Sequence, residues 1–195
     1  MFRIINSKMK DLWELRQRCE NHRVPCITPA TEEFLRTYIL EKKPQYIGEI
    51  WSAVWYSAIA MAQTSATRHS QIWSIEYSFP DYHRALQHAK NLKQYNITFY
   101  YGDGNTIDYE KLCWRKMNLL YIDGRKRDYL TYLLNSINIV ASDGTIIFDD
   151  VIKFAHKTTS LYEYLAEKQI HYTIHQLDVD DGIMVIENAG EQLSS

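Results

Sequence analysis

The sequence predicts an α/β fold built on a mostly parallel β-sheet that helices cover on both faces. Short apolar segments alternate with segments of helical composition along most of the chain, the order expected for successive strand–helix units. The apolar segments are nearly continuous, as in strands that are buried on both faces. The last two are separated only by a tight turn, which predicts an antiparallel hairpin at the C-terminal edge of the sheet.

Seven segments are short, apolar and rich in β-branched or aromatic residues, which is typical of strands. Five of them are expected to run parallel: QYIGEIW (45–51), QIWSIEY (71–77), ITFYY (97–101), MNLLYID (117–123) and GTIIFDD (144–150). The other two form the hairpin: HYTIHQLDV (171–179) and GIMVIEN (182–188), joined through Asp180, Asp181 and Gly182. The expected sheet therefore has seven strands.

The segments between the strands carry signals of helices. Helices are predicted over residues 56–66, 80–95, 127–140 and 159–169. The second of these begins with Pro-Asp and repeats apolar residues at helical spacing, which is typical of an amphipathic helix.

Two more helices are predicted before Pro44, over residues 11–22 and 28–43. Either Thr28 or Thr31 is expected to cap the second helix, because a hydroxyl there accepts a hydrogen bond from the backbone of the first turn.

Composition limits the class of protein. The chain has 195 residues, of which 46% are hydrophobic, enough for one domain with a full core. We expect a single domain over 1–195, with an N-terminal helical cover (1–43) and a sheet core (44–190). The net charge of −2 does not indicate a nucleic-acid partner. The three cysteines fit neither a disulfide framework nor a zinc pattern.

The expected location is cytoplasmic, with no membrane partner. The N-terminal residues lack the apolar core and small-residue site of a signal peptide. No apolar run approaches the roughly 20 residues that span a bilayer.

Acidic residues stand at or near the carboxyl end of each of the five parallel strands. They are Glu49, Glu76, Asp103, Asp123 and the pair Asp149 and Asp150. Open parallel sheets bind ligands at this edge. At the end of a second strand, a carboxylate such as Glu76 can accept from both hydroxyls of a ribose. For Asp103, in the segment GDGN, a role in a turn is an equal alternative.

Asp123, Asp149 and Asp150 form the cluster with the strongest chemical signal. Three carboxylates at neighbouring strand ends repel one another unless a cation or basic groups lie among them. Ligands that are all oxygen suit Mg²⁺ or a similar hard cation. The alternative is that the carboxylates pair with the basic residues at 125–127.

These segments, taken in order, resemble the class I S-adenosylmethionine-dependent O-methyltransferases of the catechol and caffeoyl-CoA type and their small bacterial relatives. The resemblance runs from about Val24 to Glu187. GEIWSAVWYSAIAMA resembles the family's L-E-I-G-T-x-x-G-Y-S-x-x-x-x-A, and LLYIDGRKRDYLTYL resembles F-I-D-A-D-K-x-x-Y-x-x-Y. VPCITPATEEFLRTYIL, IWSIEYS, YYGDGNTI, GTIIFDDVI and LDVDDGIMVI match further family segments in the same order. The resemblance implies a Rossmann-like fold and S-adenosylmethionine as cofactor.

The resemblance also implies the residues that bind the cofactor. Glu76 would hold the ribose hydroxyls, and Asp103 would meet the adenine amino group. Glu49 would orient the loop after the first strand. Trp51 and Ser57 stand within the matching loop motif and are implied to border the cofactor.

The implied catalytic residues lie at the ends of the fourth and fifth strands. Asp123, Asp149 and Asp150 would be ligands of Mg²⁺ or a similar divalent cation, with Asp123 also near the cofactor. Lys126 stands at the position of the family's general base. A bound metal lowers the pKa of the acceptor hydroxyl, and a lysine beside it takes the proton.

Four positions depart from the family pattern. Trp51 and Trp55 replace the two loop glycines, Asp150 replaces an Asn, and Arg125 replaces the second Asp of D-A-D-K. We expect Arg125 to offset part of the charge that Asp150 adds. Tryptophan is strongly disfavoured at positive φ. The loop is therefore expected either to follow another path, with the indoles in the core or in solvent, or to place them in the pocket.

Two functions follow from these observations. The first is an O-methyltransferase that uses S-adenosylmethionine with divalent-metal assistance. Its acceptor would be a hydroxylated small aromatic molecule or a hydroxylated tRNA base, and the family implies a homodimer. The second is a lapsed enzyme, or pseudoenzyme, that keeps the fold and serves as a binding or partner module. A nicotinamide-dependent dehydrogenase is disfavoured, because WSAVW offers no glycine-rich turn.

Overall fold

The computed structural model describes residues 12–17, 19–21, 25–51, 55–64, 70–113 and 115–194. In this part of the chain, seven strands form a sheet in the order β3-β2-β1-β4-β5-β7-β6. The pairs β1–β2, β2–β3, β1–β4 and β4–β5 are parallel. β7 is antiparallel to both β5 and β6. The predicted fold class, a mostly parallel sheet closed by an antiparallel hairpin, is confirmed.

The strands lie close to their predicted positions. They are β1 (Tyr46–Ile50), β2 (Gln71–Glu76), β3 (Ile97–Tyr101), β4 (Met117–Ile122), β5 (Val140–Phe148), β6 (Thr173–Gln176) and β7 (Gly182–Ile186). The α-helices are α2 (Pro29–Lys42), α3 (Tyr56–Gln63), α4 (Phe79–Asn91), α5 (Tyr109–Leu112), α6 (Tyr129–Ser136), α7 (Thr159–Glu167) and α8 (Ala189–Ser194). Short 3₁₀ turns occur at η2 (Lys126–Asp128), η3 (Ile137–Ile139) and η4 (Ala155–Lys157).

The structure corrects the predicted boundary between the helix over 127–140 and the strand that follows it. This segment is divided into η2, α6 and η3, and β5 already begins at Val140. A short apolar run fits a helix and a strand equally well, so periodicity could not place the boundary. α5 and α8 were not predicted because they are too short to show a periodic pattern. The helix predicted over 11–22 is helical at 12–17 and 19–21, and its other residues lie outside the described part. Residues 65–66 of the helix predicted over 56–66 also lie outside it.

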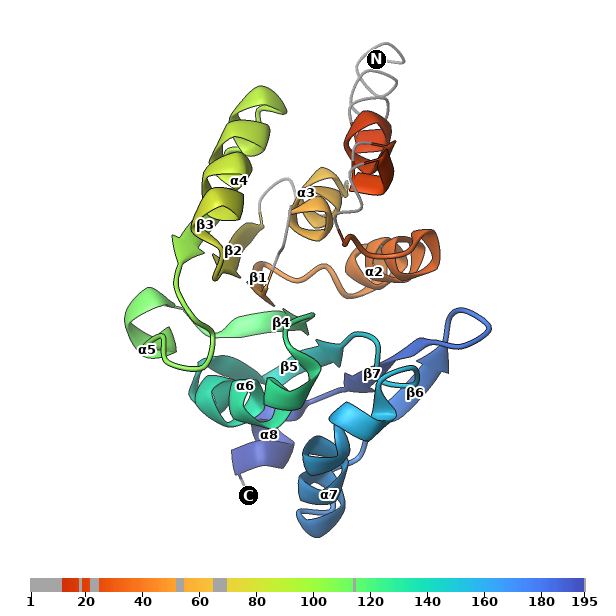
Figure 1. Ribbon diagram of the computed structural model, residues 1–195. Coiled ribbons are helices and arrows are strands. Elements are labelled where there is room, and N and C mark those ends of the chain that lie inside the picture. Colours follow the sequence, from red (N-terminus) through yellow and green to blue (C-terminus); the bar gives the residue numbers. More distant parts are fainter. Residues whose placement is uncertain are drawn as a thin grey trace.

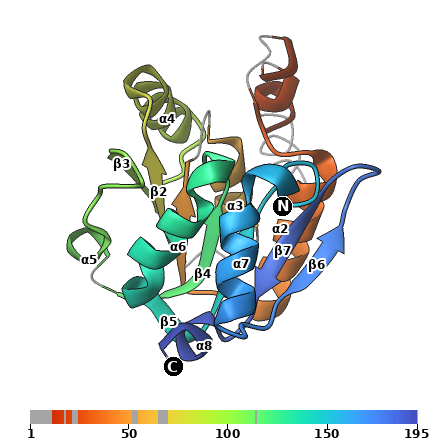
Figure 2. The ribbon, with the colours of Figure 1, turned by 60° about the horizontal axis from the view of Figure 1, so that its bottom comes forward.

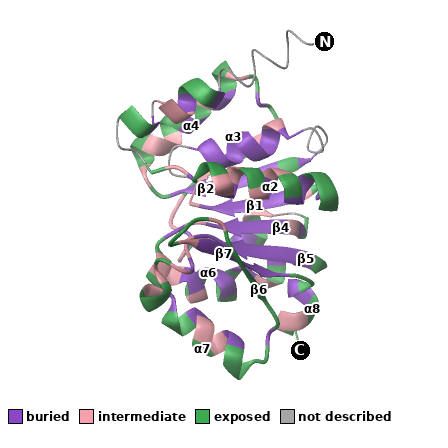
Figure 3. Cartoon of the chain, turned by 90° about the vertical axis from the view of Figure 1, so that its right-hand side faces the viewer, coloured by how far each residue is buried: buried purple, intermediate pink, exposed green. Residues whose placement is uncertain are grey.

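Helices lie on both faces of the sheet (Figures 1 and 2). α2, α3 and α4 cover one face, and α6 and α7 cover the other, with the buried strands between them (Figure 3). Successive residues of β4 alternate between the two cores. Leu119 and Tyr121 pack under α3, whereas Leu120 and Ile122 pack toward α6 and α7. This two-sided burial explains why the strands are almost continuously apolar.

Thr28 caps α2, one of the two caps that were predicted. Its hydroxyl accepts a hydrogen bond from the Thr31 backbone N–H at 3.1 Å, and Pro29 begins the helix. No helix in the described ranges is both long and apolar enough to cross a bilayer.

Glu32, in the first turn of α2, joins three helical segments. Its carboxylate accepts from Arg16 Nη2 at 2.8 Å, from Arg36 Nε at 2.8 Å and from the Tyr56 hydroxyl at 2.6 Å. Arg16 also donates to the Ile27 carbonyl at 3.0 Å. These bonds connect the N-terminal helical segment to the start of α3, which borders the predicted cofactor loop.

Replacing Glu32 by Gln is expected to destabilise the fold by about 2 kcal/mol, because two guanidinium groups and a phenol lose their charged partner. Its side chain is only 16% exposed, so solvent does not compensate for the loss. Urea denaturation would measure the change. Glu33→Gln, at an exposed position of the same helix, should shift stability by less than about 0.5 kcal/mol. Equal effects of the two substitutions would contradict this account.

Candidate active site at the carboxyl edge of the sheet

The structure brings the predicted acidic residues to one edge of the sheet. Asp123 follows β4 and its backbone N–H donates to Ile50 at 3.1 Å, while the N–H of Asp149 donates to Ile122 at 3.1 Å. Glu49 on β1 is in register with Ser74 on β2. The backbone hydrogen bonds of the sheet therefore continue one residue past β4 and β5, and they fix the positions of Asp123 and Asp149.

A cavity of about 730 Å³ lies at this edge. Six of the predicted site residues line it: Trp51, Ser57, Asp123, Lys126, Asp149 and Asp150. Glu49, Glu76 and Asp103 lie at the same edge but do not line it. Residues 25–28, before α2, form another part of the wall, together with Phe154 and Lys157. The acidic motifs did not predict these wall residues: residues 25–28 are distant from the motifs in the chain, and Phe154 and Lys157 follow Asp150 without forming a motif of their own.

Glu49 is buried behind the cavity, with an exposure of 1%. It accepts hydrogen bonds from the hydroxyl of Ser57 on α3 and from that of Ser74 on β2, the latter at 2.6 Å. Burial raises the pKa of Glu49 to about 7, although both hydrogen bonds act in the opposite direction. Glu49 thus attaches the first turn of α3 to two strands, and it uses the Ser57 hydroxyl to do so.

Trp51 and Trp55 both have the left-handed backbone conformation that favours glycine, with φ of 67° and 64°. Tryptophan disfavours this conformation, and the structure nevertheless has it at both positions. Residues 52–54 between them lie outside the described part. Positive φ costs a non-glycine residue roughly 1–2 kcal/mol. Contacts of the two indoles must offset this cost.

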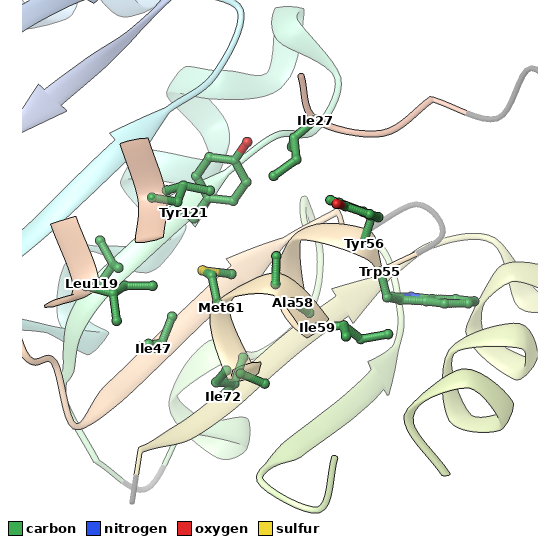
Figure 4. Close-up of a cluster of buried hydrophobic side chains, with 14 of the residues drawn as sticks. Ile27, Ile47, Trp55, Tyr56, Ala58, Ile59, Met61, Ile72, Leu119 and Tyr121 are labelled. Atoms are coloured by element: carbon green, nitrogen blue, oxygen red, sulfur yellow. The ribbon is translucent and has the colours of Figure 1, made fainter. Parts of the chain in front are cut away.

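The Trp55 indole lies in the core and does not line the cavity. It is fully buried, and its ring meets Phe99 edge-on at 5.9 Å. Figure 4 shows the indole directed toward α4 and away from Tyr121. Burying an indole of this size contributes more than the backbone conformation costs.

The Trp51 indole, in contrast, forms part of the cavity wall. It stacks on Tyr77 with ring centroids 5.7 Å apart and 9° between the planes. The guanidinium of Arg125 lies 5.5 Å from the Trp51 ring and 5.9 Å from the Tyr77 ring. We call these three residues the Trp51–Tyr77–Arg125 stack.

The stack reaches the two residues implied to bind the nucleoside. Tyr77 directly follows Glu76, and Arg125 Nη2 lies 3.5 Å from Asp103 Oδ2. Arg125 Nε donates to Asp128 at 2.8 Å. The predicted compensation of the Asp150 charge by Arg125 is not observed, because the Arg125 guanidinium pairs with Asp128 and lies near Asp103 instead.

Glu76 and Asp103 both accept local backbone hydrogen bonds. Glu76 Oε1 accepts from the Ser78 N–H at 2.6 Å, and Asp103 Oδ1 accepts from the Asn105 N–H at 2.9 Å. The turn role that was the alternative for Asp103 is therefore present. Their predicted roles toward a ribose and an adenine stay predictions.

Lys126 lies among the carboxylates at the inner end of the cavity. Its Nζ is 2.7 Å from Asp123 Oδ1, 2.8 Å from Asp150 Oδ2 and 2.8 Å from the Tyr129 hydroxyl. Burial opposes its charge, but Asp123, Tyr129 and Asp150 raise the pKa of Lys126 well above the ordinary value. In this arrangement Lys126 is an ammonium group that donates to three oxygens.

Asp149 is held by different donors. Its Oδ2 accepts from the Tyr121 hydroxyl at 2.6 Å, and its Oδ1 accepts from the Asp150 N–H at 3.0 Å. Burial, and then repulsion by Asp123 and Asp150, raise the pKa of Asp149 to about 8. A neutral Asp149 reduces the charge that Lys126 has to balance.

The three predicted metal ligands are not arranged around a common ion position. Among the described residues, no group of three His, Cys, Asp or Glu side chains is placed to hold a metal ion. Pairing with a basic residue from 125–127, the alternative to a metal, is what the structure shows, and the residue is Lys126. The donors as placed do not fit Mg²⁺.

No protein-family model matches the sequence. Solved structures are similar over most of the chain. An O-methyltransferase from Bacillus cereus in complex with S-adenosylhomocysteine (SAH) is 18% identical, with 91% of this chain and 90% of that chain covered and a TM-score of 0.77. The O-methyltransferase TomG from Streptomyces achromogenes, in complex with S-adenosylmethionine, is 14% identical, with 90% of this chain and 87% of that chain covered and a TM-score of 0.76. The SAH-bound methyltransferase PaMTH1 from Podospora anserina is 16% identical, with 92% of this chain and 86% of that chain covered and a TM-score of 0.75.

The chain has the fold of these methyltransferases. At such identities the likeness concerns the fold, so the activity has to be argued from the site.

The buried Glu49 predicts a pH dependence of stability. Its folded pKa of about 7 lies above the ordinary value of 4.5, so the folded state binds the proton more tightly. The free energy of unfolding should therefore fall as pH rises from about 4.5 to about 7, by roughly 3 kcal/mol from this group.

Denaturation at several pH values would test this, because Glu49→Gln has no proton to lose and should remove the Glu49 contribution to the decline, leaving the contribution of other groups such as Asp149. Glu163→Gln, at an exposed site on α7, should leave the profile unchanged. Parallel profiles for wild type and Glu49→Gln would show that Glu49 is not the group responsible.

Proposed function

We propose that the protein is an S-adenosylmethionine-dependent O-methyltransferase acting on a hydroxylated small aromatic molecule or a hydroxylated tRNA base. One observation carries the proposal: the cavity at the carboxyl edge joins the end of β1 to the Lys126–carboxylate cluster. A cofactor beside Trp51 and an acceptor beside Lys126 would thus share one cavity. The fold shared with methyltransferases solved with this cofactor or its product supports the proposal.

In this reaction the acceptor oxygen attacks the methyl carbon of the sulfonium. The new C–O bond forms as the S–C bond breaks, and the sulfur keeps the electron pair as a neutral thioether. The hydroxyl proton is released to solvent before or as this bond forms. The fixed positive charge of Lys126 would lower the pKa of the acceptor hydroxyl by stabilising its anion, which is the nucleophile.

The proposal assigns no step to a divalent cation, because the carboxylate donors as placed do not fit one. The base role of Lys126, the homodimer, tRNA binding and the cytoplasmic location stay predictions from the sequence.

A second candidate function is favoured by the Trp51–Tyr77–Arg125 stack. These side chains lie beside Glu76 and Asp103, where the resemblance implies the nucleoside. A nucleoside at that position would have to displace the stack. A protein in which the stack stays closed would keep the fold without the activity, and would act as a binding or partner module.

Calorimetric titration of SAH into wild type and Trp51→Gly would distinguish the two functions. An O-methyltransferase should bind SAH at micromolar concentrations, and removal of the indole should tighten binding by about tenfold. Binding by Trp51→Gly alone would mean that the indole has closed the site and would support the second function. If wild type and Trp51→Gly are both folded and neither binds SAH, the proposed methyltransferase function is contradicted.

Trp51→Ala is the matched control, because it removes the indole and keeps a side chain at positive φ. Its SAH affinity should match that of Trp51→Gly. Its stability should be lower by about 1 kcal/mol, because only glycine relieves the backbone conformation. Thermal unfolding of the two variants would measure this difference.

A further inference from the structure

The ammonium of Lys126 occupies the place that a cation would take between two of the carboxylates. Oxygen ligands bind Mg²⁺ or Ca²⁺ at about 2.0–2.6 Å. Nζ lies 2.7 Å from Asp123 Oδ1 and 2.8 Å from Asp150 Oδ2. An ion bound by these two oxygens would therefore overlap the ammonium group.

Lys126 is held at this position on several sides. Its side chain is 11% exposed, and its third contact is the Tyr129 hydroxyl at 2.8 Å. Tyr129 in turn donates to the Asp149 carbonyl at 2.8 Å. The lysine is therefore part of a buried network that also includes the backbone at the end of β5, and it differs in this from a mobile surface lysine.

The backbone before Lys126 also fixes its position. A Cβ added at Gly124 would lie 2.6 Å from the Tyr132 ring on α6. Only glycine permits this close approach, which brings the start of η2 against α6. Lys126 is the first residue of η2, so its side chain starts next to the carboxylates.

Asp149 is directed to other donors and, among the described residues, does not complete a three-carboxylate metal site with Asp123 and Asp150. Both of its oxygens accept hydrogen bonds, from the Tyr121 hydroxyl and from the Asp150 N–H. A divalent cation bound to the remaining oxygens of Asp123 and Asp150 would face the ammonium at short range, and like charges repel strongly where water is excluded.

We propose that Lys126 is the resident cation of the Asp123–Asp149–Asp150 cluster, and that it excludes a divalent metal from it. The carboxylates keep the capacity to bind a metal, and removal of the ammonium group exposes that capacity. The inference concerns metal binding alone and does not depend on the proposed methyl transfer.

Calorimetric titration with Mn²⁺, Mg²⁺ and Ca²⁺ tests the proposal directly. The wild type should show no saturable binding up to millimolar metal. Lys126→Ala should bind at least one of these ions with affinity at least about tenfold tighter than any wild-type binding. Its melting temperature should rise when that ion is added, whereas that of the wild type should not change.

Two further variants serve as controls. Lys157→Ala removes a lysine that lines the same cavity but lies over the Phe154 ring at 4.5 Å, and it should gain no metal affinity. Lys126→Arg keeps the positive charge and should also bind no metal. If Lys126→Ala does not fold alone, refolding with and without Mn²⁺ replaces the titration, and recovery only with the metal is expected.

Either of two results would overturn the proposal. One is saturable metal binding by the wild type that Asp150→Asn weakens, because the cluster would then hold ammonium and metal together. The other is a Lys126→Ala protein that neither binds nor responds to any of the three ions. SAH titration of the same preparations is a separate measurement, so failure of the proposed methyltransferase activity would remain distinguishable.

Discussion

The crowding of carboxylates at one edge of the sheet is the constraint on which the rest of this site depends. Because β1 to β5 are parallel, the acids that follow them converge in one region, where burial strengthens repulsion between like charges. Every one of these acids has a hydrogen-bond donor. Glu49 accepts from serine hydroxyls, Glu76 and Asp103 from backbone N–H groups, and Asp149 from a phenol. Asp123 and Asp150 share the ammonium group of Lys126. The donors come from different elements, so neutralising this edge also joins the elements to one another.

The sequence was sufficient to place the strands and the acids, because both depend on local signals. Continuous apolar runs mark buried strands, and an acid at the end of each run is directed to the same edge once the strands are parallel. The pairing of the acids could not be obtained this way. The three carboxylates predicted an Mg²⁺ site, with pairing to a basic neighbour as the alternative. Whether the carboxylates meet a metal or a lysine depends on the position of Lys126, which Tyr129 and Gly124 set only in the folded chain.

The two tryptophans show the same limit. The sequence identified both as replacements of glycine and correctly treated positive φ as the difficulty. It could not show that the chain keeps the glycine-like conformation and offsets its cost by packing. Trp55 does so in the core against Phe99, and Trp51 does so against Tyr77 and Arg125. Equivalent substitutions in one motif therefore place their indoles differently: Trp55 lies in the core, whereas Trp51 forms part of the cavity wall.

The contact between Trp51 and Arg125 relates two of the departures that the sequence presented as separate. A guanidinium stacks on an indole and pairs with an acid at the same time, which the Asp of the family motif cannot do. Arg125 thereby connects the Trp51 ring to Asp103 and Asp128. Any ligand directed to Glu76 and Asp103 has to compete with an indole, a phenol and a guanidinium that stabilise one another. The stack and the Lys126 cluster are thus two separate sets of contacts at this edge, because Lys126 is held by Asp123, Asp150 and Tyr129, none of which belongs to the stack.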